Sequence, residues 1–334
     1  MAQEKEPLAR CGAVAAYERE AMILTVTMNP SIDTSYTVDR LVVDGVNRVV
    51  PIKTAGGKGL NVSRVLVQLG DDVVATGLLG GHMGEFIADR LDEDGVTHRF
   101  TRIAGESRVC ISVLHEGNQT EFLESGPTVT TSELDGFLAT FRELLAKADC
   151  VTMSGSLPAG VPEDTYARMV EIAAGAGVPV LLDTSGASLD AALEAADKPA
   201  LVKPNLDEVN GLLGTSFTTD DLSELRDAIV SDGRFAGVPW VVVSMGSAGS
   251  VAFREGRVLR ATSTPIEAVN ATGSGDSTIA GFAHAIAAGL DDCSVLAYGN
   301  ACGKLNAMDE RTGHLPMEKW DEVFASISVE ELDL

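Results

Sequence analysis

The sequence predicts an α/β fold, in which a mostly parallel β-sheet is covered by helices on both faces. Short, almost wholly apolar runs alternate with amphipathic helical stretches along most of the 334 residues. Such runs are typical of strands buried on both sides, and their alternation with helices indicates parallel pairing. With 45% apolar residues the chain can build a large core, and its length suits one large domain.

The strands expected in the main sheet are short, and most end in small or polar residues. Helical patterns separate them, for example over 84–94, 132–148 and 162–177. Ligands of such sheets bind outside the carboxyl ends of the strands, so the polar residues there are candidates for a site. The expected strands lie within 22–28, 73–80, 150–156, 178–185, 200–205 and 240–246.

Two stretches break this alternation and predict a second, smaller sheet. Residues 33–54 and 97–124 alternate between apolar and polar side chains and contain no helical pattern. We expect their strands to form a small β-sheet beside the main domain. A sheet of that size needs its open face covered by a ligand, by the main domain or by a second subunit.

Composition excludes several classes of function. The net charge of −24 and the aromatic content of 5% argue against a nucleic-acid partner, because a polyanion would be repelled and its bases would find few stacking surfaces. No apolar run reaches the length of a membrane span. The five cysteines show neither a CxxC pair nor a zinc-ligand spacing, which favours a cytoplasmic protein. Residues 1–21 lack the order of a signal peptide, so we expect a disordered leader before a folded domain at 22–334.

The most informative motif is "NATGSGDSTIAGF" at 270–282, where glycines lead into a helical pattern. Gly273, Ser274 and Gly275 are expected at a helix N-terminus, whose free N–H groups bind phosphate and stabilise developing negative charge. Asp276 would lie in the first turn, where a carboxylate can accept a proton from an attacking hydroxyl. The alternative role for Asp276 is that of a helix cap.

A second glycine-rich stretch, "TAGGKGLNVSRVLVQLG", also leads into a helix. Gly57 permits a close approach of the backbone, Lys58 supplies a positive charge, and Asn61 faces the same side one turn later. No Ser or Thr follows the lysine, so a Walker-type loop is excluded and a pocket for a phosphorylated polyol fits better. The alternative is a glycine turn whose lysine points into water.

Polar residues follow other expected strands as well. Asp33 can accept hydrogen bonds from sugar hydroxyls, or else it caps a surface turn. Lys203, Asn205 and Glu208 lie at a strand end and in the first turn of a helix, where oxygen ligands suit a hydrated Mg²⁺ that shares phosphate oxygens with a nucleotide. A later loop, which can admit a nucleotide or simply form a hairpin turn, contains Ser244, Gly246 and Gly249.

The order of these motifs resembles that of the PfkB (ribokinase-like) carbohydrate kinases. The series reads "NPSID", "GGKGLN", "SGSLP", "KPNLDE", "SMGSAG" and "GSGD", and the resemblance extends from Met22 to the C-terminus. Within the family, "KTAGGKGLNVSRVL", "LHEGNQTEFLESGP" and "NAMDERTGH" resemble the tagatose-6-phosphate kinases most, and the 1-phosphofructokinases next.

The resemblance implies a ribokinase-like three-layer α/β/α sandwich with a small β-sheet lid, through which a homodimer forms. It implies transfer of phosphate from ATP, with Mg²⁺, to a primary hydroxyl of a sugar phosphate. Asp276 then corresponds to the catalytic base, and Gly273, Ser274 and Gly275 to its anion hole. The implied sugar site contains Asp33, Gly57, Lys58, Asn61 and Ser154. The implied nucleotide site contains Lys203, Asn205, Ser244, Gly246, Gly249, Gly275 and Asn300, and the implied metal ligands are Glu208 and Asn205.

The phosphate already present on the substrate is expected to bind Lys58, Arg108 and Arg48. A guanidinium can engage two phosphate oxygens at once. Both arginines fall in the lid stretches, so closing the lid would bring positive charge onto the sugar phosphate and exclude water. Alternatively, they are exposed arginines on an acidic protein.

The family resemblance predicts a kinase that converts D-tagatose 6-phosphate to D-tagatose 1,6-bisphosphate. The alternatives are a 1-phosphofructokinase, which converts fructose 1-phosphate to fructose 1,6-bisphosphate, and a non-catalytic sugar-phosphate sensor. One departure is that the subgroup reads "NPVGSGD" where this chain has "NATGSGD". The proline's fixed φ is lost, but "GSGD" is intact, so we expect activity to be retained.

Overall fold

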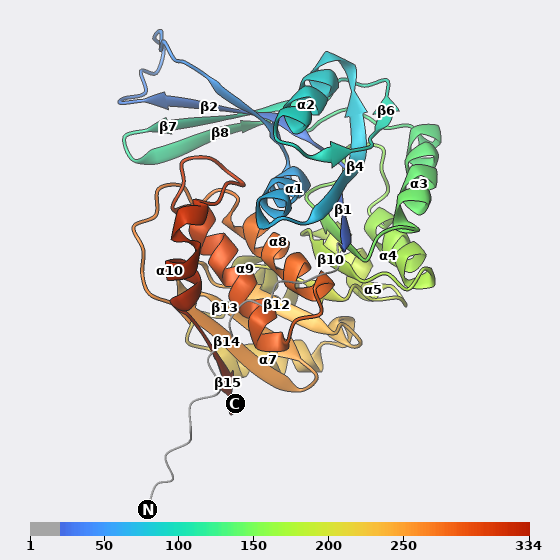
Figure 1. Cartoon of the computed structure of the whole chain (residues 1–334), viewed down its shortest axis with the longest axis vertical. Helices are drawn as coiled ribbons and strands as arrows, with labels where there is room; N and C mark the ends of the chain where they lie inside the picture. Colours follow the sequence, from blue (N-terminus) through green and yellow to red (C-terminus); the bar gives the residue numbers. More distant parts are fainter. Residues whose placement is uncertain (1–20) are drawn as a thin grey trace, which may run out of the picture.

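A large sheet flanked by helices forms the body of the molecule, and a second, small sheet projects from one end (Figure 1). This computed structural model describes residues 21–334, so all of the predicted leader except Ala21 lies outside the described residues. The arrangement confirms the predicted α/β class. Within the described range, no helix is both long enough and apolar enough to cross a membrane.

Across the main sheet, the order is β15 (Ile327–Leu332), β14 (Arg257–Ser263), β13 (Ser250–Arg254), β12 (Trp240–Ser244), β11 (Leu201–Val202), β10 (Val180–Asp183), β9 (Cys150–Ser154), β1 (Met22–Thr27), β4 (Asp72–Gly80) and β5 (Thr97–His98), and β6 (Thr101–Ile103) also pairs with β4. The sheet is parallel from β5 to β12 and antiparallel from β12 to β15. Every strand predicted from an apolar run lies in the parallel part, and in chain order these strands are β1, β4, β9, β10, β11 and β12.

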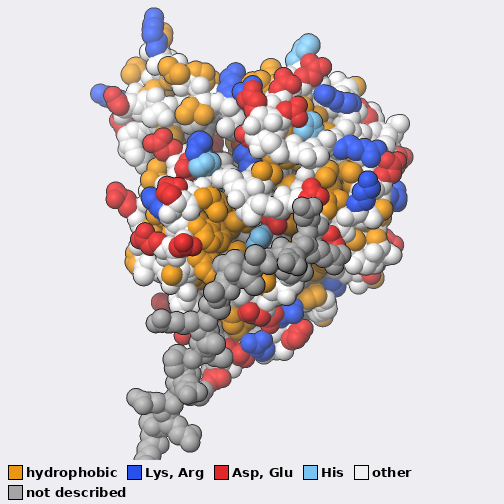
Figure 2. Space-filling model, in the orientation of Figure 1, with side chains coloured by type: hydrophobic (Ala, Val, Ile, Leu, Met, Phe, Trp, Pro, Cys, Tyr) orange, Lys and Arg blue, Asp and Glu red, His pale blue; other side chains and the backbone are white. Residues whose placement is uncertain are grey.

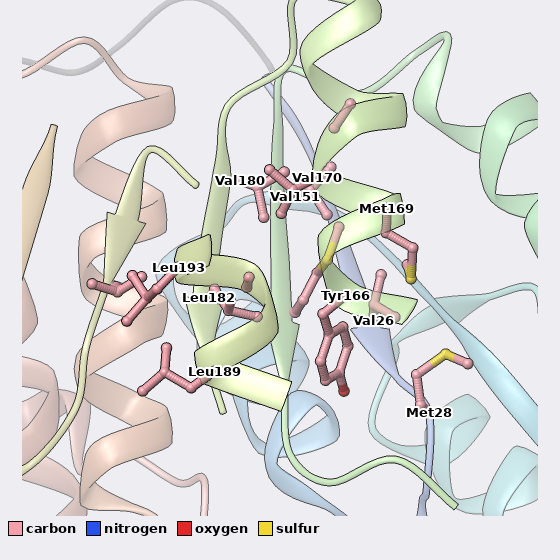
Figure 3. Close-up of a cluster of buried hydrophobic side chains, with 14 of the residues drawn as sticks. Val26, Met28, Val151, Tyr166, Met169, Val170, Val180, Leu182, Leu189 and Leu193 are labelled. Carbon is pink, nitrogen blue, oxygen red and sulfur yellow. The ribbon is translucent and has the colours of Figure 1, made fainter. Parts of the chain in front are cut away.

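The two faces of this sheet have separate cores, because successive strand residues point to opposite sides. In β1, Leu24 packs into one core and Ile23 into the other. In the first core, Tyr166 lies fully buried near Leu182 and Val26 (Figure 3). Helices over the first face are α3 (Thr131–Leu145), α4 (Thr165–Gly175), α5 (Ala187–Glu194), α6 (Leu206–Leu213) and α7 (Leu222–Ser231). Helices over the second are α1 (Lys58–Leu69), α8 (Ser274–Ala287), α9 (Asp292–Ala307) and α10 (Trp320–Ala325).

The small sheet, or lid sheet, has the order β3 (Ile52–Gly56), β2 (Ser31–Val38), β7 (Arg108–His115) and β8 (Asn118–Leu123). Its inner end packs against α2 (Gly81–Glu93), where Ile32 and Ala55 meet Ile87.

The four strands of the lid sheet lie, to within two residues, in the two stretches predicted for them, but parts of those stretches lie outside this sheet. Residues 97–103 do not belong to the lid sheet, because β5 and β6 pair with β4 of the main sheet. Residues 39–51 contain no strand and form the connection between β2 and β3. The polarity pattern of a short segment does not show which sheet it joins, or whether it forms a strand.

Candidate active site

The "GSGD" motif begins helix α8, as the sequence predicts. Gly273 precedes the helix with φ 80°, and a Cβ there would lie 2.4 Å from Thr312 Cγ2, so the turn requires glycine. The buried amide of Asn306 holds this turn by donating to Thr272 O at 2.9 Å and accepting from Gly313 N at 2.8 Å. The Ser274 N–H points to Ala271 O, 3.2 Å away, so the N–H of Gly275 is the better placed for a ligand.

Asp276 is 6% exposed, and among the described residues no backbone N–H donates to its carboxyl group as it would to a helix cap. Its Oδ2 instead accepts from Asn61 Nδ2 at 2.7 Å. Burial, together with the nearby negative charge of Asp183, raises the pKa of Asp276 to about 7, although Lys58, Asn61 and Lys203 oppose the shift. Its carboxyl group therefore changes protonation near neutral pH, the range that suits a general base.

Asp183, at the end of β10, is a site residue that the sequence analysis missed. It is 2% exposed, with Lys203 Nζ 3.4 Å from Oδ1 and Lys58 Nζ 3.9 Å from Oδ2. The pKa of Lys58 is raised, first by Asp183 and further by Asp276 and Glu208. Lys58 thus lies among three carboxylates. The rule that polar residues at strand ends form sites applies to Asp183 too, and would have found it.

Neighbouring strand ends carry buried polar atoms without a hydrogen-bond partner in the described part of the chain. These atoms are Asn29 Oδ1 after β1, Ser154 Oγ at the end of β9, and Asp183 Oδ2 at the end of β10. Ser154 and Asp183 are directly opposite in the register of the two strands. Since buried polar atoms are nearly always satisfied, this edge of the sheet is where a polar ligand or ordered water belongs.

Asp33 lies in β2 rather than in a surface turn. Ser31 Oγ donates to its Oδ1 at 2.6 Å, and Gly56 lets the carboxyl pack against the chain, since a Cβ there would lie 2.0 Å from Asp33 Cγ. Burial raises the pKa of Asp33, whereas Ser31, Arg64, Arg108 and the Gly57 N–H oppose the shift. The carboxyl is therefore oriented and partly enclosed, as a sugar-binding acceptor needs to be.

The structure places the two predicted phosphate-binding arginines differently. Arg108 lies near Asp33, but its guanidinium donates to Asn29 O at 3.0 and 3.2 Å and to Glu124 O at 2.9 Å. Arg48 is exposed on the connection between β2 and β3, which projects away from the main sheet (Figure 1). Only Arg108 is brought beside the other predicted sugar-site residues.

Asn205 and Glu208 form a reciprocal cap at the start of α6. Asn205 Oδ1 accepts from Glu208 N and Glu208 Oε2 accepts from Asn205 N, both at 2.8 Å. The Asn205 oxygen is thereby occupied, whereas the second oxygen of Glu208 is left for a ligand near Lys58. Within residues 21–334, no group of three or more acidic, His or Cys side chains is arranged to hold a metal. This donor set fits Mg²⁺ only as a hydrated ion shared with phosphates.

The loop after β12 lies beside this cap, because Ser244 forms a bridge with Asn205. Gly249 has φ 88°, and a Cβ there would lie 2.0 Å from Ala261 O, so the turn itself explains this glycine. Gly246 also has positive φ, 56°. The Asn300 amide donates to Ser250 Oγ at 2.9 Å and so joins α9 to β13. Nucleotide binding by these residues stays a prediction.

Comparison with known proteins gives consistent matches over nearly the whole chain. A putative phosphofructokinase from Staphylococcus aureus is 30% identical, with a TM-score of 0.77 over 93% of this chain and 99% of that one. A possible 1-phosphofructokinase from Thermotoga maritima is 28% identical, with a TM-score of 0.83 over 93% and 100%. Escherichia coli phosphofructokinase-2 is 26% identical, with a TM-score of 0.83 over 91% and 98%; other structures of it contain fructose 6-phosphate or show a tetrameric inhibited form.

Residues 26–320 match the family described as pfkB family carbohydrate kinase. The match includes the lid sheet, the strand ends with their unpartnered polar atoms, and the turn before Asp276. The chain therefore belongs to the PfkB family of carbohydrate kinases.

Proposed function

We propose that the protein is an ATP-dependent kinase that phosphorylates a primary hydroxyl of a ketohexose phosphate. The observation that carries this proposal is the buried carboxyl of Asp276, which lies in the first turn of α8 beside Lys58 and Lys203 and has its pKa raised to about 7. A base, an anion-binding helix start and two cations are together the parts that phosphoryl transfer requires. A sensor without catalysis has no use for such a base.

In this mechanism, Asp276 accepts the proton of the sugar hydroxyl while that oxygen attacks the γ-phosphorus of ATP. The new P–O bond forms as the bond to the β-phosphate oxygen breaks, and ADP leaves with the electron pair. Asn61 occupies Asp276 Oδ2, so Oδ1 is the oxygen that takes the proton. Lys58, Lys203 and the N–H groups at the start of α8 offset the charge on the phosphoryl oxygens.

Glu208 is the residue that would hold Mg²⁺, through its free oxygen and bound waters, while Asn205 keeps Glu208 in place as its capping partner. When bound, the ion supplies charge neutralisation on the nucleotide phosphates.

Two classes of acceptor sugar are candidates for this function. The named relatives include phosphofructokinases, which supports a fructose phosphate, whereas the segments resembling tagatose-6-phosphate kinases support tagatose 6-phosphate. A coupled ADP-release assay with ATP against tagatose 6-phosphate, fructose 6-phosphate and fructose 1-phosphate separates them. We expect turnover with at least one, and saturable sugar-phosphate binding without any turnover would instead identify a sensor.

Replacing Arg108 by alanine is expected to raise KM for the sugar phosphate by about 10- to 100-fold, the effect of losing one or two charge-assisted hydrogen bonds. KM for ATP should change far less, because Arg108 lies by Asp33 in the lid sheet. Steady-state kinetics with each substrate varied in turn measures both. Arg102→Ala, at an exposed position in β6, is the control, and an unchanged sugar KM in Arg108→Ala would remove Arg108 from the site.

The lid sheet is the surface through which we expect two copies to associate. Hydrophobic side chains gather on the face of this region seen in Figure 2. Exposed apolar side chains gathered in one region often mark an interaction surface, and the open face of a small sheet needs a cover. The exposed residues include Phe122 (61%) and Leu123 (64%) of β8, and Val43 (78%), Val46 (77%) and Val50 (87%) of the neighbouring β2–β3 connection.

Replacing Phe122 by glutamate should raise the dimer dissociation constant by about 100-fold, because a buried unpaired carboxylate costs a few kcal/mol. Sedimentation equilibrium of both proteins measures this constant. The matched control is Val230→Glu, at a position in α7 that is 73% exposed and outside the lid. Equal dissociation constants for Phe122→Glu and the unmodified protein would place the interface elsewhere.

A further inference from the structure

We propose that Arg64 is a positioning residue for the base: it fixes the orientation of the Asn61 amide, which in turn fixes the carboxyl group of Asp276. The proposal rests on the proposed function of Asp276. It starts from a buried arginine whose guanidinium donates a hydrogen bond to the Asn61 amide.

The contacts form a chain from one helix to another. Arg64 and Asn61 lie three residues apart on α1, so their side chains meet on one face. Arg64 Nη2 donates to Asn61 Oδ1, and Asn61 Nδ2 donates to Asp276 Oδ2 at 2.7 Å. The guanidinium also donates to Ala55 O of the lid strand β3 and, at 3.4 Å, to Thr312 O.

The chemistry of these groups makes the amide orientation unambiguous. A guanidinium can only donate, so the Asn61 atom that faces Arg64 has to be the oxygen. The amide nitrogen must then face Asp276 and donate to it. If the amide turned over, Asn61 Oδ1 would meet the carboxylate oxygen, and two acceptors in contact favour a protonated, and therefore inactive, base.

Other charged groups surround Arg64 and Asp276, the first and last residues of this series of hydrogen bonds. Asp276 is faced by Asp183 of β10, by Lys58 of α1 and by Lys203 after β11. Arg64 is faced by Asp94 after α2, with Nη1 3.8 Å from Oδ2, by Asp33 of β2 and by Asp276 itself. Arg64→Lys keeps the positive charge that Asp276 experiences, so it separates the loss of charge from the loss of the hydrogen bond to Asn61. Among the hydrogen bonds of the described residues, the one to the Asn61 amide oxygen comes from Arg64, so this residue is the one whose loss frees the amide.

The buried position of Arg64 supports a specific role. Burial lowers the pKa of its guanidinium, which shows that its charge is held in an unfavourable environment. The turn at Gly313 is fitted around the pair, since a Cβ there would lie 3.1 Å from Asn61 Cα and 3.3 Å from Arg64 Nε. The same turn contacts Gly273 through Thr312. The segment around Gly313 therefore packs against both the Asn61–Arg64 pair and the start of α8.

The test compares Arg64→Gln and Arg64→Lys with Gln68→Leu. Gln68, one turn further along α1, hydrogen-bonds Gly313 O, Leu315 N and the backbone oxygen of Arg64, and these bonds involve neither the Arg64 guanidinium nor Asn61. We expect Arg64→Gln to lower kcat by about 10- to 100-fold, as misplaced catalytic groups do, with both KM values little changed. The acid limb of kcat/KM against pH should move to higher pH. Arg64→Lys should retain part of the activity, and Gln68→Leu should lower Tm without moving the limb.

Two further measurements test the positioning role of Arg64 separately from the proposed function of Asp276. If Arg64 acts through Asn61, adding Arg64→Gln to Asn61→Leu should cost little further kcat; independent, multiplying losses would overturn the proposal. ¹³Cγ-aspartate NMR, assigned with Asp276→Asn, follows the Asp276 titration without any substrate. A higher pKa of Asp276 in Arg64→Gln and Arg64→Lys supports the positioning role even in a protein inactive toward every sugar phosphate tried. An unmoved pKa of Asp276 overturns it while leaving the kinase proposal standing.

Discussion

Replacing Asp276 by asparagine should lower kcat by about 10²- to 10⁴-fold, the range that a positioned general base contributes. Asparagine keeps the size of the side chain and its hydrogen bond with Asn61 but cannot take the proton of the sugar hydroxyl. Binding should survive, because the groups proposed to contact the phosphates, namely the start of α8, Lys58 and Lys203, are unchanged. The expected pattern is this loss of kcat with near-normal dissociation constants for ATP and the sugar phosphate, measured by isothermal titration calorimetry.

The same carboxyl sets the expected pH dependence. Its pKa is raised to about 7, and a base acts only when it is deprotonated. The value of kcat/KM should therefore rise with pH through about 7 and level off above it, since this ratio reports the free enzyme. Asp33→Asn is the matched control in the same site: it should raise the sugar KM and keep the acid limb. An Asp276→Asn enzyme with more than a tenth of normal kcat would contradict the base assignment.

The main sheet could be predicted because its strands are buried on both faces and read as unbroken apolar runs, such as Ile23 to Val26. The boundaries of the lid sheet could not. Thr97–His98 lies in a stretch with the polarity pattern of a lid strand but pairs with β4, and the valine-rich segment from Val42 to Val50 joins two strands instead of forming one. Which sheet a short segment joins depends on partners far along the chain, which local pattern does not contain.

The site could be predicted in part, for a similar reason. The glycines before Asp276 indicate a helix start, but whether Asp276 caps that helix or acts outside it depends on Asn61, 215 residues away. Asp183 gave a usable signal, as a polar residue that ends a buried strand. Arg64 and Asn306 carried no such signal in the sequence. An Arg or Asn in a helical pattern usually faces solvent, and here the segment around Gly313, distant from Arg64 in the sequence, contacts both residues.

Asp183→Asn should lower the free energy of unfolding by about 3 kcal/mol, the lower end of the range for breaking a buried ion pair. Asp183 is the carboxylate beside Lys203, which is 5% exposed, and its loss leaves that ammonium buried without its counter-charge. Urea denaturation measures the change. The matched control is Asp190→Asn, which breaks the surface pair with Arg234, where Asp190 is 41% exposed, and should cost less than about 1 kcal/mol.

The same substitution should move the acid limb of kcat/KM to lower pH, opposite to the shift expected for Arg64→Gln. Asp183 is the negative charge that helps to raise the pKa of Asp276, while Lys58 and Lys203 oppose it. Without Asp183, the repulsion is gone and both ammonium groups are free to attract Asp276, so its carboxyl group loses its proton more readily. A limb that stays in place or moves upward would show that burial alone holds the pKa of Asp276 near neutrality, and that Asp183 serves only to anchor the two lysines.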